Sequence, residues 1–217
     1  MNFVFISASN VERARESSAS TRACELLADA VRGEYPDAEI NILRLLDYHL
    51  TPCSMCGGCI KTERCHDTTF NKIYAALKAA DGIFMVCPHY APFPSKVMIL
   101  LEKLQEIVFL KSTLDENYKF PLAGKPAGVV AHGGMTEEAL PYYEKSLLTP
   151  LAQSMASVGL KIQPASEEQK RGVVFGIQSL TLPPGERFVK IEHDWDVIEA
   201  RLRLLAHAVA AAAAAGG

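Results

Sequence analysis

Residues 3–9 read Phe-Val-Phe-Ile-Ser-Ala-Ser, a short apolar run that ends in two serines. A continuous apolar segment of this length predicts a strand buried on both faces, which is typical of a parallel sheet. A polar loop, residues 7–21, follows, and apolar residues then recur at helical spacing from Cys24 to about Gly33. A helix that begins after such a strand points its N-terminus at the carboxyl edge of the sheet. Its free N–H groups and its dipole favour an anion there.

Strand-like and helical segments alternate along the rest of the chain. Strand character marks residues 38–43, 83–87, 126–131 and 160–163, the last extended by residues 173–175. Helical spacing marks residues 67–80, 95–108, 137–158 with a break at Pro150, and 196–215. Residues 111–125 and most of 164–194 have an irregular pattern. We therefore expect an α/β fold, namely a flavodoxin-like doubly wound five-stranded parallel sheet in the order 2-1-3-4-5 with helices on both faces, in one domain of residues 1–217.

The loop after the first strand is rich in hydroxyl groups and carries two arginines. Its polar residues are Ser7, Ser9, Arg13, Arg15, Ser17, Ser18, Ser20 and Thr21. One serine is enough to cap a helix, so six hydroxyls exceed that need. The loop has neither the Gly-x-Gly-x-x-Gly nor the Walker pattern, which disfavours a dinucleotide or a triphosphate. Hydroxyls with a guanidinium predict a site for a single phosphate monoester.

Two more loops follow predicted strands at the same sheet edge. Residues 88–96 read Pro-His-Tyr-Ala-Pro-Phe-Pro-Ser-Lys, and the candidate contacts in them are Pro88, His89, Tyr90, Ala91, Phe93 and Ser95. This stiff aromatic loop could flank a flat ring, although its aromatic residues could also plug the gap between helix and sheet. The other loop is His132-Gly133-Gly134, whose glycines permit a close approach of backbone to ligand. His132 is more simply a hydrogen-bonded loop residue. Together the three loops match FMN, which has one phosphate, a ribityl chain and a flat ring.

Four of the six cysteines lie within residues 53–65, Cys-Ser-Met-Cys-Gly-Gly-Cys-Ile-Lys-Thr-Glu-Arg-Cys. The spacing is Cys-x2-Cys-x2-Cys-x5-Cys, and repeated two-residue gaps are typical of iron–sulfur ligands. The pattern predicts a [4Fe-4S] cluster on Cys53, Cys56, Cys59 and Cys65, in a loop inserted after the second strand. Because this strand is expected next to the first, we expect the cluster to lie beside the hydroxyl-rich loop. Zinc sites usually have two cysteine pairs separated by a dozen or more residues. A loop that binds no metal is the other alternative.

Composition excludes several classes of partner. The chain has 217 residues, 49% of them hydrophobic and 22% charged, with a net charge of −3 and both signs mixed. Nucleic acid and anionic membranes are therefore not expected as partners. The longest uncharged run, residues 146–160, is too short to span a bilayer. Free cysteines without a secretory signal pattern lead us to expect a reducing, cytoplasmic location.

From Phe3 to about Lys161, the chain resembles the iron–sulfur flavoproteins within the NADPH-dependent FMN reductase group of flavodoxin-like proteins. The resemblance rests on Ser-x-Ser after the first strand, Ser18-Ala-Ser20-Thr21, the four-cysteine loop, Ala80-Asp81-Gly82, Pro88-x-Tyr90 and Gly133-Gly134. It implies FMN in the first loop and the 88–95 loop, a cluster on the four cysteines, and a homodimer or homotetramer. The first loop is longer than usual in the group, so either Arg13 or Arg15 could meet the phosphate.

A cluster passes one electron at a time, whereas a flavin holds one or two. The sequence therefore predicts a flavin-dependent oxidoreductase that passes electrons between a [4Fe-4S] cluster and FMN, with a small protein such as ferredoxin, or NAD(P)H, as donor. Such a relay needs no acid–base residue, so no catalytic residue is named. One alternative is an NAD(P)H-dependent FMN or quinone reductase without a cluster. Another is a zinc-binding redox sensor without turnover.

Overall fold

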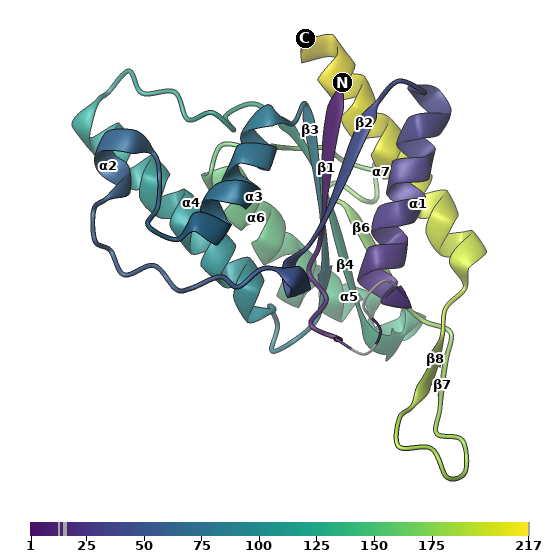
Figure 1. Cartoon of the computed structure of the whole chain (residues 1–217). Coiled ribbons are helices and arrows are strands. Elements are labelled where there is room, and N and C mark those ends of the chain that lie inside the picture. Colours follow the sequence, from purple (N-terminus) through teal and green to yellow (C-terminus); the bar gives the residue numbers. More distant parts are fainter. Residues whose placement is uncertain (13, 15–16, 217) are drawn as a thin grey trace.

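The computed structural model describes residues 1–12, 14 and 17–216. A parallel sheet lies at its centre (Figure 1), in the order β2-β1-β3-β4-β5, with β6 paired to β4 as well. The strands are β1 (Asn2–Ser7), β2 (Glu39–Arg44), β3 (Gly82–Pro88), β4 (Pro126–Thr136), β5 (Lys161–Ile162) and β6 (Val173–Ile177). The predicted flavodoxin-like order is confirmed.

Helices cover both faces of this sheet (Figure 1). One face carries α1 (Ala19–Glu34) and α7 (Trp195–Gly216), and the other carries α3 (Thr68–Ala79), α4 (Ser95–Leu114) and α6 (Thr149–Ser157). Shorter turns are η2 (Leu45–Asp47), α2 (Cys59–Thr62), η3 (Glu137–Ala139), α5 (Leu140–Tyr143) and η4 (Glu144–Leu148). No helix in the described part of the chain is long and apolar enough to cross a bilayer.

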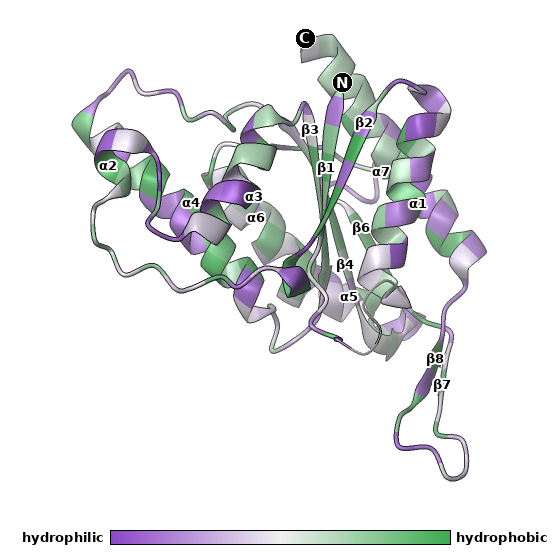
Figure 2. Cartoon of the chain, in the orientation of Figure 1, coloured by the Kyte–Doolittle hydropathy of each residue, from purple (hydrophilic) through white to green (hydrophobic). Residues whose placement is uncertain are grey.

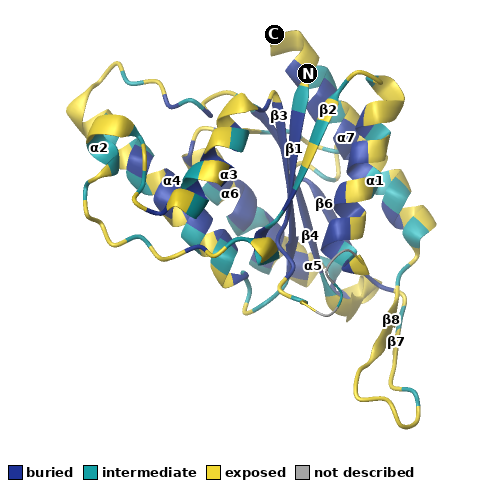
Figure 3. Ribbon diagram, in the orientation of Figure 1, coloured by how far each residue is buried: buried dark blue, intermediate teal, exposed yellow. Residues whose placement is uncertain are grey.

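The first strand shows how the sequence builds two cores. Because successive side chains of a strand point to opposite faces, Phe3 and Phe5 pack against α1 and α7, whereas Val4 and Ile6 pack on the other side. Phe5 also stacks on Phe84 of β3, with ring centroids 4.7 Å apart. The central strands are buried along their length while the outer faces of the helices are polar and exposed (Figures 2 and 3).

Two elements after residue 108 are longer than the sequence predicts, and one predicted break is present. The helix expected to end near residue 108 continues to Leu114, and β4 continues to Thr136. The long helix of residues 137–158 is interrupted by the π-helical turn η4 immediately before Pro150, which confirms the expected break.

The fifth sheet position is divided between two short strands. Here β5 pairs with the start of β4 at Pro126 and Ala127, whereas β6 pairs with its later half from Val130 onward. The expectation that most of residues 164–194 are irregular is wrong in part, because β7 (Ser179–Thr181) and β8 (Lys190–Glu192) form an antiparallel hairpin. Strands of three residues are too short for their alternation to be recognised in the sequence.

The carboxyl ends of the three central strands meet at one edge of the sheet. Register pairs Ser7 with Val86, and Pro88 with His132. The loops after β1, β3 and β4 therefore begin side by side, as expected for the binding crevice of a doubly wound fold.

Candidate functional site

A cavity of about 690 Å³ lies at this edge. Nine of the predicted cofactor-binding residues line it: Ser9, Ser18, Ser20, Pro88, His89, Tyr90, His132, Gly133 and Gly134. They come from all three loops, so the structure brings together the groups that the sequence predicted to be neighbours. A cavity of this size is within the usual range for small-molecule and cofactor sites.

The hydroxyl-rich loop forms one end of the cavity at the start of α1. Ser18 is the N-cap, and its Oγ accepts a hydrogen bond from the backbone N–H of Thr21 at 3.2 Å. Ser7 and Thr21 do not line the cavity. Their buried hydroxyls are 2.9 Å apart and fasten β1 to α1. The N-terminus of a 16-residue helix and the hydroxyls of Ser18 and Ser20 make this end suited to an anion. Arg13 and Arg15 lie outside the described residues.

His132 joins β4 to α1 beneath the cavity. Its Nε2 lies 2.8 Å from Ser20 Oγ, and its ring stacks on Phe175 with centroids 4.7 Å apart. Burial, with a smaller contribution from the charge of His193, lowers the pKa of His132 to about 3. The imidazole is therefore neutral at physiological pH and holds Ser20 in place, which agrees with the simpler of the two roles considered for it.

The loop after β3 also lines the cavity. The backbone N–H of His89 donates to the carbonyl of His132 at 2.7 Å, which ties this loop to β4. Nε2 of His89 is buried and has no hydrogen-bond partner among the described residues. Burying a polar atom without a hydrogen-bond partner is costly. We therefore expect this nitrogen to form a hydrogen bond with a ligand or a water molecule in the cavity.

Three residues predicted from this loop do not line the cavity. Ala91 adopts a left-handed backbone, with φ of 55°, at the turn of the loop. Phe93 packs against the core beside α4, and Ser95 begins that helix. The position of Phe93 matches the alternative that this aromatic residue fills the gap between helix and sheet.

Gly133 lies against Tyr143, whose hydroxyl accepts a hydrogen bond from the N–H of Met135 at 2.9 Å. A Cβ at residue 133 would collide with the Tyr143 ring, whereas a Cβ at Gly134 would meet nothing within 4 Å. Only glycine therefore fits at position 133, and the backbone there can approach a ligand closely.

One wall of the cavity comes from residues that the sequence prediction missed. It contains Arg22, Ile177, Val189, Ile191, His193 and Trp195. The guanidinium carbon of Arg22 lies 4.6 Å from the Trp195 ring centroid, and His193 packs on the same ring at 4.9 Å. Arg22 follows the hydroxyl run directly, which is a signal that could have identified it. The apolar residues of the hairpin carry no such signal.

The cysteine loop does not contribute to this cavity. It leaves the sheet edge after η2 and runs outward along α4 (Figure 1), and none of its residues lines the cavity. The expectation that it lies beside the hydroxyl-rich loop is therefore wrong. The backbone is left-handed at Met55, Gly57 and Glu63, so the loop turns tightly.

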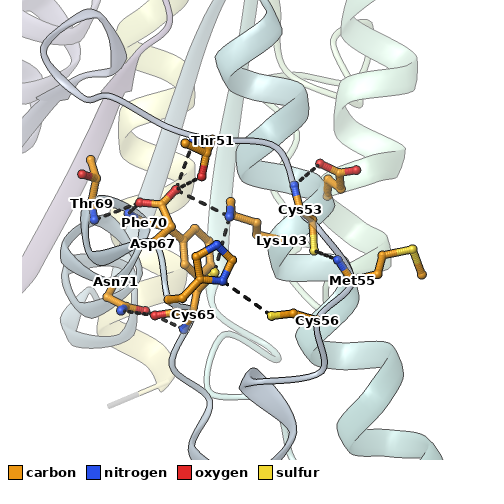
Figure 4. A network of polar contacts seen from close by, with 12 residues as sticks. Thr51, Cys53, Met55, Cys56, Cys65, Asp67, Thr69, Phe70, Asn71 and Lys103 are labelled. Carbon is orange, nitrogen blue, oxygen red and sulfur yellow. Dashed lines mark hydrogen bonds and ion pairs between the residues drawn. The ribbon is translucent and has the colours of Figure 1, made fainter.

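The thiols of Cys56 and Cys65 lie beside different groups (Figure 4). Cys65 Sγ lies 3.4 Å from the ammonium of Lys103, and Cys56 Sγ lies 3.5 Å from His66 Nδ1. Hydrogen bonds from the Gly58 backbone, and then from the His66 side chain, lower the pKa of Cys56 to about 7.

The pKa of Cys59 is raised, and two other thiols of the loop contribute to the shift. Burial raises its pKa most, a hydrogen bond from its own backbone lowers it, and the charges of Glu106, Cys53 and Cys65 raise it further. Cys53 and Cys65 are thus close enough to affect the pKa of Cys59. Among the residues that the structure describes, however, no three His, Cys, Asp or Glu side chains are placed to hold one metal ion. The donor set has the chemistry of a soft-metal site, but the predicted four-sulfur arrangement is not formed.

The family model described as NADPH-dependent FMN reductase matches residues 1–156. The chain belongs to the NADPH-dependent FMN reductase family. Membership makes it a flavin-dependent oxidoreductase of a family in which FMN is the cofactor and NAD(P)H the electron donor. The part of the resemblance that concerns iron–sulfur flavoproteins is not tested by this match.

Solved structures with this fold include three flavin-related proteins. RosB with a bound 8-demethyl-8-formylriboflavin-5'-phosphate intermediate is 16% identical, with a TM-score of 0.60 over 99% of this chain and 79% of that one. An NADH:FMN oxidoreductase, EmoB, is 18% identical, with a TM-score of 0.57 over 99% and 89%. A flavodoxin from the domain Archaea is 10% identical, with a TM-score of 0.52 over 99% of both chains. At such identities the likeness shows the fold alone. No curated protein sequence matches the chain.

Proposed function

We propose that the chain is a reductase that binds FMN in the cavity and passes electrons from NAD(P)H through it to a small acceptor. The observation that carries this proposal is the cavity itself, because the hydroxyl loop, the 88–90 segment and the 132–134 segment all line it. Its size and its lining, which combines hydroxyl groups with glycines and aromatic residues, suit a phosphorylated flavin. The structure with a similar fold that holds a riboflavin 5'-phosphate derivative gives further support.

The hydroxyl end would hold the phosphate. Ser18, Ser20 and the first N–H groups of α1 supply donors, and Arg22 supplies a positive charge at the same wall. Trp195 lies under the guanidinium and limits its movement. Because His132 is neutral, its role here is to fix the Ser20 hydroxyl.

The segments after β3 and β4 would take the flavin ring. At Gly133 the backbone could approach the ring closely, because glycine has no side chain. Pro88, His89 and Tyr90 line the same cavity. When bound, FMN supplies hydride acceptance and transfer of one or two electrons. The buried side chain of Ile177 would limit the access of water to the wall beside it.

The test is an anaerobic reduction assay. Protein loaded with FMN should lose its flavin absorbance when NADPH or NADH is added, and should regain it when a quinone is supplied. Binding of FMN without bleaching by either nucleotide would contradict the proposed donor. Absence of FMN binding would contradict the proposed function as a whole.

A metal centre on the cysteine loop is a second candidate feature, in which a [4Fe-4S] cluster on Cys53, Cys56, Cys59 and Cys65 exchanges electrons with FMN and with a donor such as ferredoxin. The observations in its favour are the Cys-x2-Cys-x2-Cys-x5-Cys spacing and the effect of the charges of Cys53 and Cys65 on the pKa of Cys59. Anaerobic purification followed by metal analysis tests it. Iron at about four per chain favours the cluster, one zinc favours a structural or sensing site, and neither metal favours the reductase without a cluster.

We also propose that the chain forms a homodimer or homotetramer in a reducing, cytoplasmic compartment. The hairpin of β7 and β8 projects from the body of the protein (Figure 1), and Leu180, Leu182 and Phe188 are exposed on it. An isolated two-stranded hairpin is only marginally stable in water, so it suits an interface. Light scattering of the purified protein tests this proposal, and a monomer at all concentrations would contradict it.

A further inference from the structure

The hairpin of β7 and β8 has one apolar face and one polar face. Leu180 pairs with Ile191 across the two strands, so their side chains share a face. The opposite face is polar, and its side chains contact one another. Ser179 Oγ donates to the Glu192 carboxylate at 2.8 Å, and Lys190 Nζ lies 3.0 Å from the same carboxylate.

The apolar face continues a wall of the cavity. Val189, Ile191 and His193 alternate along the chain and all line the cavity, so the face to which they belong borders it. Leu180 lies beside Ile191 on that face but outside the cavity. The apolar wall therefore runs from the cavity out onto the hairpin, which projects from the body of the protein (Figure 1).

The apolar side chains of this face are only partly covered. Leu180 is 50% exposed, Ile191 43% and Val189 38%, and most of the hairpin around them is exposed (Figure 3). A single exposed apolar residue needs no explanation, but here three share one face beside a cavity. An apolar patch that continues a ligand cavity is typical of a surface on which part of a ligand lies.

The charges of the hairpin indicate the kind of ligand. Lys190 and Glu192, the charged residues of β8, lie on the polar face and pair with each other. Within the two strands, all of whose residues the structure describes, the face that borders the cavity carries no charged side chain. A charged substituent would lose hydration there without gaining a partner, whereas an alkyl or prenyl chain would be removed from water.

We propose that the electron acceptor is a quinone with an apolar side chain, whose ring enters the cavity and whose chain lies along Val189, Ile191 and Leu180. This inference rests on the proposed function and names the class of its acceptor. The overall reaction needs no further reagent. NAD(P)H gives up a hydride and becomes NAD(P)⁺, and the quinone takes up the equivalent of that hydride and one proton from water to become the quinol.

The homo-oligomer proposed above has other residues of the hairpin available to it. Leu182 and Phe188 are exposed nearer the turn, so a contact between copies there leaves the face of Leu180 and Ile191 to the acceptor. A second copy seated on Leu180 itself is the competing occupant of this face, and the experiment separates the two.

The experiment is equilibrium dialysis of the oxidised, FMN-loaded protein against one benzoquinone in two forms, without a side chain and with a decyl chain. No electron donor is present, so the quinone is not consumed. Leu180→Ser is the main variant, because it removes a half-exposed apolar group outside the cavity. Thr181→Ser, on the polar face of the same strand, controls for a loosened hairpin. Leu204→Ser, at a leucine of α7 that is 52% exposed, is the matched control for the loss of an exposed leucine.

Wild type should bind the decyl quinone roughly tenfold or more tightly than the quinone without a chain, and Leu180→Ser should reduce this ratio about three- to fivefold. Both controls should keep the wild-type ratio. Equal binding of the two quinones by wild type, or an unchanged ratio in Leu180→Ser, would overturn the proposal. A change of assembly in Leu180→Ser, measured by light scattering, would assign Leu180 to a contact between copies and would overturn it as well.

The same two ratios are also measured on the FMN-free protein. Failure of FMN to bind, or to be reduced by NAD(P)H, would contradict the proposed function and is observed in its own assay. Failure of the decyl chain to strengthen binding contradicts the present inference alone, so the two failures are distinguishable.

Discussion

The buried His132, which holds Ser20 in place, makes the stability of the protein depend on pH. The native imidazole has a pKa of about 3 because it is buried, whereas in the unfolded chain its pKa is near 6.5. Between these values the unfolded chain binds a proton that the native protein does not, so stability rises with pH in this range. The contribution is complete above pH 6.5 and is lost as pH falls. For one such group the loss between pH 7 and pH 5 is about 2 kcal/mol.

The matched variant is His132→Gln, which keeps a polar group within reach of Ser20 but does not titrate. Urea unfolding of both proteins at pH 7 and pH 5 gives the difference in their free energies of unfolding. Wild type should be the more stable at pH 7, because the variant loses the stack on Phe175, and this advantage should shrink by about 2 kcal/mol at pH 5. A constant difference between the two pH values would refute the reasoning, since His132 would then titrate alike in native and unfolded states.

Three other predictions concern the cavity. Gly133→Ala places a methyl group against the Tyr143 ring, so the free energy of unfolding should fall by about 1–3 kcal/mol and FMN binding should be lost. Gly134→Ala, which meets open space, should change stability by no more than about 0.5 kcal/mol, and equal effects of the two variants would contradict this account. Arg22→Ala should weaken FMN binding by roughly tenfold or more and leave riboflavin binding unchanged, as measured by flavin fluorescence, while Arg32→Ala on the outer face of α1 should alter neither.

The part of the cavity formed by the three loops could be predicted from the sequence, because local residue patterns and the expected strand order indicate the same place. The apolar run after Met1 and the hydroxyls that follow it predict a buried strand and a helix cap, and Ser18 is that cap. Strand order then places the 88–90 and 132–134 segments beside it, because parallel strands end at a common edge. These three loops could therefore be identified as one site without coordinates.

The remaining wall could not be predicted for a physical reason. Trp195 reaches Arg22 from the far end of the chain through a segment whose strands have three residues each, and such segments have no recognisable period. The cysteine loop shows a different limit. Spacing indicates that thiols can converge, but contacts of individual cysteines with residues outside the loop, such as Lys103 and Asn71, decide where each sulfur points.

The central claim is that the cavity at the ends of β1, β3 and β4 holds a flavin by its phosphate. The most direct measurement is a calorimetric titration of the wild-type protein with FMN and, separately, with riboflavin. The account predicts that one FMN binds per chain. Because the hydroxyl loop and Arg22 would bind the phosphate, which riboflavin lacks, FMN should bind more tightly than riboflavin by roughly tenfold or more. Equal affinity for the two flavins, or no binding of either, would contradict it.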